Sequence, residues 1–125
     1  MMKYFFAISL AAAILVATAC DSTQPKHSGT LTAVVDSPNG AEGAAVINVR
    51  DPVDSFTAVE GTSLYQTPTP TGTHIILVRL TPGELSMKVN VPDVSSLPHF
   101  FVIEVADGEN KIRPTPSDYH VSFLR

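Results

Sequence analysis

The chain has 125 residues, with 12 acidic against 8 basic side chains, a formal net charge of −4 and a single cysteine. This charge balance argues against nucleic acid as a partner, because no cluster of lysine and arginine is present to neutralise phosphates. One cysteine cannot form a disulfide within the chain, so a domain of this size must be held together by packing alone.

The first 19 residues have the layout of a secretory signal peptide. Lys3 precedes an uncharged apolar run from Tyr4 to Ala19, which is shorter than the roughly 20 residues of a membrane-spanning helix. Small residues then lead directly into the cysteine, in the order Leu15-Val16-Ala17-Thr18-Ala19-Cys20. This ending resembles the lipobox of bacterial lipoproteins. The resemblance implies that the leader is removed, that Cys20 is lipidated, and that the protein is held in the cell envelope by this lipid.

Two alternatives to lipidation stay open at Cys20. An ordinary signal peptidase could cleave after Ala19 and leave a free thiol, or the leader could remain as an uncleaved anchor. We favour lipidation, because an unpaired thiol is a liability in an oxidising compartment and the lipid consumes it. Loss of the leader removes Lys3 and leaves a net charge of −5.

The rest of the chain divides into a tether and one domain. Residues 20–29 comprise Cys20 and a polar segment, Asp21 to Gly29, which contains no large aliphatic side chain. We expect this segment to act as a flexible tether. Residues 30–125 are long enough for a single small domain.

Strands are the predicted elements of this domain. Prolines divide it into windows of mostly nine to fifteen residues, which would break helices but suit strands with their turns. Apolar residues recur at every second position within the windows, as on a strand with one buried face. The candidate strands, in chain order, are Thr30 to Val35, Ala44 to Arg50, Ser55 to Val59, Ser63 to Gln66, His74 to Leu80, Glu84 to Val91, Phe100 to Val105 and Tyr119 to Leu124.

Three of these strands carry finer predictions. His74 to Leu80 is almost entirely apolar, which predicts a central strand covered on both faces. In the strand after Pro82-Gly83, the side chains predicted to face the core are Leu85, Met87, Val89 and Val91. In the next strand, strict alternation places Phe101, Ile103 and Val105 on one face and Phe100, Val102 and Glu104 on the other.

Turn residues agree with this pattern. Pro38-Asn39-Gly40 and Asp107-Gly108 offer turns that need a positive φ. Asp93 to Leu97, between two prolines, is the only segment expected to make a single helical turn. The predicted fold class is therefore all-β: a single antiparallel β-sandwich of seven to nine strands, immunoglobulin-like or jelly-roll.

Three segments of the domain resemble cohesin domains: Ile47 to Val53, Pro82 to Val89, and Val105 to Gly108. Cohesins are jelly-roll sandwiches that bind dockerins through a sheet face. The resemblance implies a cohesin-like sandwich more than it implies a dockerin as partner.

The sequence offers no assembled catalytic or metal site. No Gly-x-Ser-x-Gly motif frames a nucleophile, and no closely spaced histidine and methionine pair suggests copper. We therefore expect a non-enzymatic protein without a cofactor. The main alternative is a periplasmic carrier of a small ligand or metal, for which His74, Met87 and His99 would be the first ligands to test; an enzyme is a third class.

Three residues are candidates for partner binding. Tyr65 and Phe100 are aromatic side chains suited to stacking on a sugar or to a protein interface, and Glu104 interrupts a very apolar strand. The expected function is that of a membrane-anchored envelope lipoprotein with a non-catalytic binding or structural module, whose partner is an envelope protein or a glycan.

Overall fold

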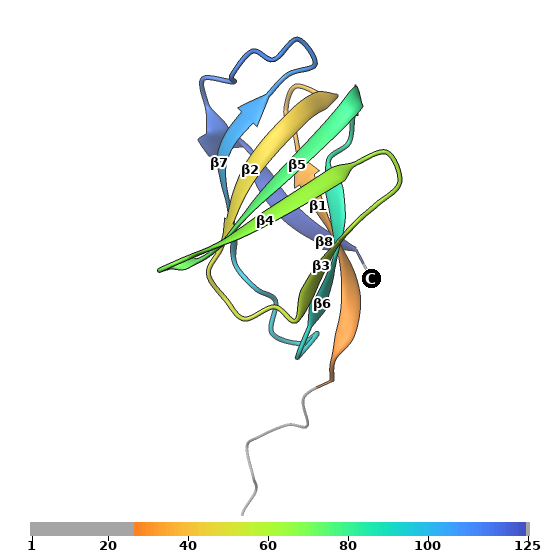
Figure 1. Cartoon of the computed structure of the whole chain (residues 1–125), viewed down its shortest axis with the longest axis vertical. Helices are drawn as coiled ribbons and strands as arrows, with labels where there is room; N and C mark the ends of the chain where they lie inside the picture. Colours follow the sequence, from red (N-terminus) through yellow and green to blue (C-terminus); the bar gives the residue numbers. More distant parts are fainter. Residues whose placement is uncertain (1–26, 125) are drawn as a thin grey trace, which may run out of the picture.

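A computed structural model describes residues 27–124, which form a sandwich of two four-stranded antiparallel sheets (Figure 1). The all-β sandwich predicted from the sequence is confirmed, with eight strands. Sheet A has the order β3-β6-β1-β8 and sheet B the order β4-β5-β2-β7. The predicted leader and Cys20 lie outside the described residues. The strands are β1 (Gly29–Asp36), β2 (Glu42–Val49), β3 (Ser55–Ala58), β4 (Ser63–Thr69), β5 (Gly72–Gly83), β6 (Ser86–Val91), β7 (Phe100–Ala106) and β8 (His120–Leu124).

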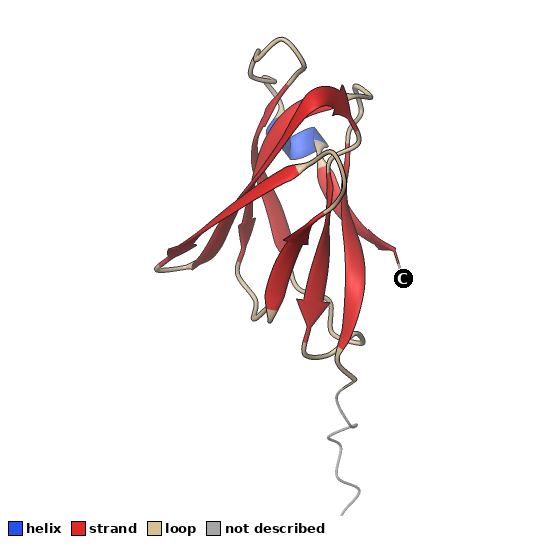
Figure 2. Ribbon diagram, turned by 45° about the vertical axis from the view of Figure 1, so that its right-hand side comes forward, coloured by secondary structure: helices blue, strands red, loops and turns tan. Residues whose placement is uncertain are grey.

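The chain passes from one sheet to the other at almost every connection. Only β4 and β5 are consecutive strands of the same sheet, and they form the single hairpin among these eight strands. The turn at Pro38-Asn39-Gly40, where Gly40 has a φ of 83°, carries the chain from β1 in sheet A to β2 in sheet B. Figure 2 shows the two layers side by side. Most strand neighbours are therefore distant in sequence.

The core lies between the two sheets and follows the predicted period of two. On β6 the side chains predicted to face the core are indeed buried, and Met87 and Val89 have no exposed surface. Lys88, between them, is exposed on the opposite face. The core cluster consists of Leu31, Ala33, Val35, Ala45, Ile47, Val49, Ile75, Leu77, Leu85, Met87, Val89, Val91, Val105 and Tyr119.

The strict alternation predicted for β7 is wrong. A β-bulge shifts the register opposite Val46 and Ile47, so that Val46 pairs with Glu104 while Ile47 pairs with Val102. The extra residue, Ile103, is 43% exposed. A bulge reverses which face the following residues point to. The inward side chains are therefore Phe100, Val102 and Val105, and those on the outer face are Phe101, Glu104 and Ala106.

Strand β5 holds a central position in sheet B, as predicted, but its outer face is not covered. Ile75 and Leu77 are completely buried on the inner face. On the outer face, Ile76 is 39% exposed, and Leu80 near the end of the strand is 99% exposed. The apolar run therefore marks a sheet face that no other part of the described chain covers.

The helical turn expected at Asp93 to Leu97 is not formed. The segment is a turn closed by a backbone hydrogen bond from the Ser96 N–H to the Asp93 carbonyl at 3.2 Å. The Asp93 carboxylate also accepts hydrogen bonds from the backbone N–H and the hydroxyl of Ser95, at 3.0 Å and 2.6 Å. Such local side-chain bonds compete with helix formation. Within residues 27–124, the one helical turn is the 3₁₀ turn Pro116–Asp118, which begins with proline.

Candidate binding surface

The outer face of sheet B is a continuous surface built from all four of its strands. Cross-strand pairing places Tyr65 beside Ile76, Ile76 beside Val46, and Val46 beside Glu104. This central row of side chains thus runs from one edge of the sheet to the other. The row on one side of it is Ser63, Val78, Ala44 and Ala106, and the row on the other side is Thr67, His74, Asn48 and Phe101.

Large apolar side chains are exposed across this face. Tyr65 is 60% exposed and Phe101 is 45% exposed, while Ile112, which pairs with the end of β7, is 59% exposed. The Arg50 guanidinium lies over the Phe101 ring, 4.8 Å from its centroid, in a cation–π contact. An apolar patch that polar residues flank is typical of a protein interaction site. We call this surface the sheet-B face.

The structure places two of the three candidate binding residues on one face of the sheet, but not in contact with each other. Tyr65 and Glu104 stand at opposite edges of the sheet-B face, in the same row of paired residues. Phe100 turns inward instead and packs against Phe123, with ring centroids 5.2 Å apart. Phe101 occupies the outer position because of the β7 bulge. The apolar run of β5 was the sequence feature that could have identified Ile76 as part of this surface.

The sheet-B face is uneven from side to side. On β2 and β7 the small side chains Ala44 and Ala106 form the floor of a shallow hollow of about 220 Å³, which Ile112 and Glu104 border. On β5 and β4 the same row continues with Val78 and Ser63, and the neighbouring row there carries the larger Ile76 and Tyr65. The hollow on β2 and β7 therefore lies beside a ridge of larger side chains, Tyr65, Ile76 and Val78, on β4 and β5.

Asn48 is a buried polar residue within the face. Its side chain is only 8% exposed, and its Oδ1 atom has no hydrogen-bond partner among the described residues. It lies between His74 and Phe101, with which it is paired across the strands. An unpartnered buried amide oxygen destabilises a fold by about 1–3 kcal/mol. An apolar side chain at position 48 would therefore be expected to give a more stable fold than asparagine does.

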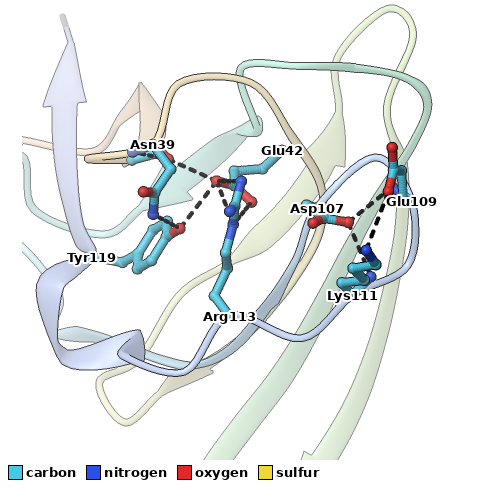
Figure 3. Close-up of polar contacts among 8 residues, drawn as sticks. Asn39, Glu42, Asp107, Glu109, Lys111, Arg113 and Tyr119 are labelled. Atoms are coloured by element: carbon cyan, nitrogen blue, oxygen red, sulfur yellow. Dashed lines mark hydrogen bonds and ion pairs between the residues drawn. The ribbon is translucent and has the colours of Figure 1, made fainter.

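A second polar site lies at the β1–β2 end of the sandwich, around the buried carboxylate of Glu42 (Figure 3). Arg113 donates to both of its oxygens from Nε, at 3.2 Å and 3.1 Å. The hydroxyls of Tyr119 and Ser37 donate to Oε1, at 3.0 Å and 2.9 Å, and Asn39 donates to the Tyr119 hydroxyl at 2.8 Å. The hydrogen bonds to Glu42, together with the negative charge of Glu42, raise the pKa of Arg113 above its ordinary value.

We call Glu42, Arg113, Tyr119, Ser37 and Asn39 the Glu42 cluster, and its hydrogen bonds explain how the Glu42 carboxylate can be buried. Every oxygen of the carboxylate has a donor, and a guanidinium lies within 3.1 Å, so the charge is both paired and hydrogen-bonded. The cluster links β2 of sheet B to the segment that leads into β8 of sheet A. Its role is to hold the two sheets together at this end of the sandwich.

A third polar contact lies at the opposite end, where Asp51 follows β2 and His99 precedes β7. The Asp51 Oδ2 atom accepts hydrogen bonds from the His99 backbone N–H at 2.6 Å and from the ring Nδ1 at 2.7 Å. These two bonds lower the pKa of Asp51 below its ordinary value. Both side chains are well exposed to solvent. The pair therefore fastens two loops and is not a buried centre.

The three residues named for a carrier do not meet. Met87 is buried in the core, His74 is on the sheet-B face and His99 is in the loop before β7. Among residues 27–124, no group of three or more histidine, cysteine, aspartate or glutamate side chains is placed to hold a metal ion. In the same part of the chain, no helix has the length and apolar character needed to cross a membrane.

Comparison with protein families, with curated proteins and with solved structures finds no match to this chain.

Proposed function

We propose that this protein is a lipoprotein of the bacterial cell envelope, anchored to the membrane through Cys20, and that its sandwich is a non-catalytic module that binds an envelope protein or a glycan. The observation that carries the binding role is the sheet-B face, where Tyr65, Ile76 and Phe101 are exposed together.

The exposure of apolar side chains supports a binding role for this face. Covering exposed apolar side chains with a partner lowers the free energy by roughly 25 cal/mol per Å² of apolar surface removed from water. On the outer face of sheet A, the large apolar side chain that is well exposed is Leu124, and the other members of its row are Thr32, Lys88 and Thr57. Within the described chain, that face therefore carries no apolar patch of the same extent. The resemblance to cohesins, which bind through a sheet face, adds to the proposal.

The anchor is tested with Cys20→Ser in the full-length chain, expressed in a bacterial host. We expect the substitution to abolish metabolic labelling with palmitate, and either to release the protein from the membrane fraction or to leave it unprocessed. Palmitate labelling that persists in the substituted protein would overturn the anchor.

The binding face is tested by placing a photo-crosslinking amino acid at one position at a time in the anchored protein. Tyr65 is the position on the sheet-B face, and Lys88, exposed on the outer face of sheet A, is the matched control. Adducts with an envelope component are expected from position 65 and not from position 88. Equal adducts from both positions, or none from position 65, would contradict a binding role for this face.

A further inference from the structure

We infer that the partner of the sheet-B face is a second copy of this chain, anchored in the same membrane and docked face to face about a two-fold axis that runs between β5 and β2, parallel to the strands. The inference rests on the proposed function, because it requires two copies held at one membrane surface.

The strand order dictates which residues such an axis brings together. Sheet B runs β4-β5-β2-β7, so a two-fold axis at its centre places β5 opposite β2 of the second copy and β4 opposite β7. The axis preserves height along the strands, so residues of one row face residues of the same row. Ile76 therefore lies opposite Val46 of the second copy, and Val78 lies opposite Ala44.

The shape of the face suits this arrangement. The same axis places the ridge on β4 and β5 over the hollow on β2 and β7 of the second copy. Within one row, Ala44 faces Val78 of the second copy and Ala106 faces Ser63. The larger Tyr65 and Ile76 of the neighbouring row stand over the border of the hollow, which lets the two layers interdigitate as in aligned sheet packing. Two identical flat faces would lack this complementarity.

The polar groups at the edges are also complementary. Tyr65 and Glu104 belong to one row at opposite edges, so the axis places the phenol of each copy beside the carboxylate of the other. A phenol donates a hydrogen bond and a carboxylate accepts one. The two Glu104 carboxylates stay apart, separated sideways by three strand spacings or about 14 Å. Arg50, which lies over Phe101, supplies a positive charge at the same face, and this charge reduces the repulsion between two acidic proteins that approach through it.

The size of the face explains why anchoring matters. Four strands and about 20 Å of strand length give a footprint on the order of 400 Å² per copy. A stable complex usually buries about 800 Å² per partner, so this contact is weak between copies free in solution. Confinement to one membrane raises the effective concentration of the copies above that in free solution, which favours a weak contact. Because the axis is parallel to the strands, the start of β1 lies at the same end of the dimer in both copies, so both can be anchored in one membrane (Figure 1).

The test is pairwise crosslinking in membranes that contain two full-length variants, each with its own C-terminal epitope tag. One variant carries Tyr65→Cys and the other Glu104→Cys, and a short bismaleimide is added. The matched control pair is Thr57→Cys with Leu124→Cys, which occupy the same row at opposite edges of sheet A. The chain without an added cysteine reports any crosslinking through Cys20.

We expect the mixed pair on sheet B to give a dimer that carries both tags, several-fold more abundant than with either variant alone or with the control pair. Adding Ala106→Arg, which fills the hollow with a charged side chain, should reduce this dimer several-fold. Resistance to limited proteolysis confirms that the variant is folded, and Ile76→Lys on the ridge is the second variant for the same loss.

Three outcomes would overturn the inference. Equal crosslinking of the sheet-A control pair would mean random collision, and preferred crosslinking of position 65 to itself would mean a different orientation. Crosslinks from positions 65 and 104 to another envelope component, without any dimer, would exclude a second copy while leaving the binding module intact. Loss of the protein from the membrane fraction would instead count against the anchor, which palmitate labelling tests separately.

Discussion

The two outer faces of the sandwich differ in the polarity of their side chains. On sheet A the row that contains Asn90 is polar and its members are hydrogen-bonded to one another: Asn90 donates to the Ser55 hydroxyl at 2.6 Å and accepts a hydrogen bond from Thr30. On sheet B the central row contains Ile76 and Val46. Both sheets present the same kind of apolar inner face to one core, so folding alone would be served by a polar outer face on each. The apolar outer face of sheet B therefore points to a second use.

The two central asparagines sharpen this comparison. Asn90 on sheet A is hydrogen-bonded to its cross-strand neighbours, whereas the Asn48 Oδ1 atom on sheet B has no partner within the described chain. One asparagine stabilises a solvent-facing ladder. The other is a buried polar group at a surface where packing would favour an apolar side chain.

The largest expected effect separates the inner face from the outer face of one strand. Met87→Ala removes a completely buried side chain from β6 and leaves a cavity, so it should lower the free energy of unfolding by about 2–5 kcal/mol. Lys88→Ala, on the outer face of the same strand, should change it by less than about 0.5 kcal/mol. Urea denaturation of both variants measures the difference. Similar losses at the two positions would mean that the register of β6 is not the one described.

A smaller effect is expected where a polar network joins the two sheets. Tyr119→Phe removes a hydroxyl that donates to the buried Glu42 carboxylate and accepts from Asn39, so it should destabilise the protein by about 2 kcal/mol. Tyr65→Phe is the matched control, because the Tyr65 side chain is 60% exposed and lies on the sheet-B face. This control should stay within about 0.5 kcal/mol of the parent protein. Equal stability of the two variants would show that the Glu42 cluster does not hold the sheets together.

The two asparagines give a third prediction. Asn90→Val removes an amide with two partners and should destabilise the protein by about 1 kcal/mol, whereas Asn48→Val removes an unpartnered amide oxygen and should be neutral or stabilising by up to about 1 kcal/mol. Both substitutions replace asparagine by valine within a strand, so the gain in β-propensity cancels when the two variants are compared. Thermal or urea unfolding of the pair gives the comparison. A destabilised Asn48→Val variant would show that the Asn48 amide has an intramolecular role.

The fold was predictable because the period of two is a local property of the sequence. The alternation of Leu85, Met87 and Val89 is set by the pleat of one strand and does not depend on its neighbours. Strand pairing was not predictable, because six of the seven connections between these strands cross to the other sheet. The residues of such a connection do not determine which strands pair with each other.

The candidate surface was predicted in part, and for similar reasons. Tyr65 and Glu104 could be singled out by type, but their common row exists only through β5 and β2, which lie between them. Phe100 and Phe101 could not be told apart, because a single extra residue in β7 decides which of them faces outward. The Glu42 cluster joins residues more than 70 positions apart, which no local pattern reveals.

The smallest expected effect concerns pH, at the end of the sandwich opposite the Glu42 cluster. Hydrogen bonds from the His99 backbone and ring hold the pKa of Asp51 below its ordinary value of 3.8. A carboxyl whose pKa is lower in the folded state stabilises the fold at pH values above its unfolded pKa, and this contribution is lost as the pH falls through the folded pKa. Asp51→Asn cannot titrate, so its unfolding free energy should fall less steeply than that of the parent protein as the pH is lowered from about 5 to about 2.5. Asp93 and Asp107, which also have lowered pKa values, act equally in both proteins and cancel in the difference. Denaturation curves measured across this range, at constant ionic strength, give the two slopes. Parallel slopes would show that the Asp51–His99 contact does not persist in solution.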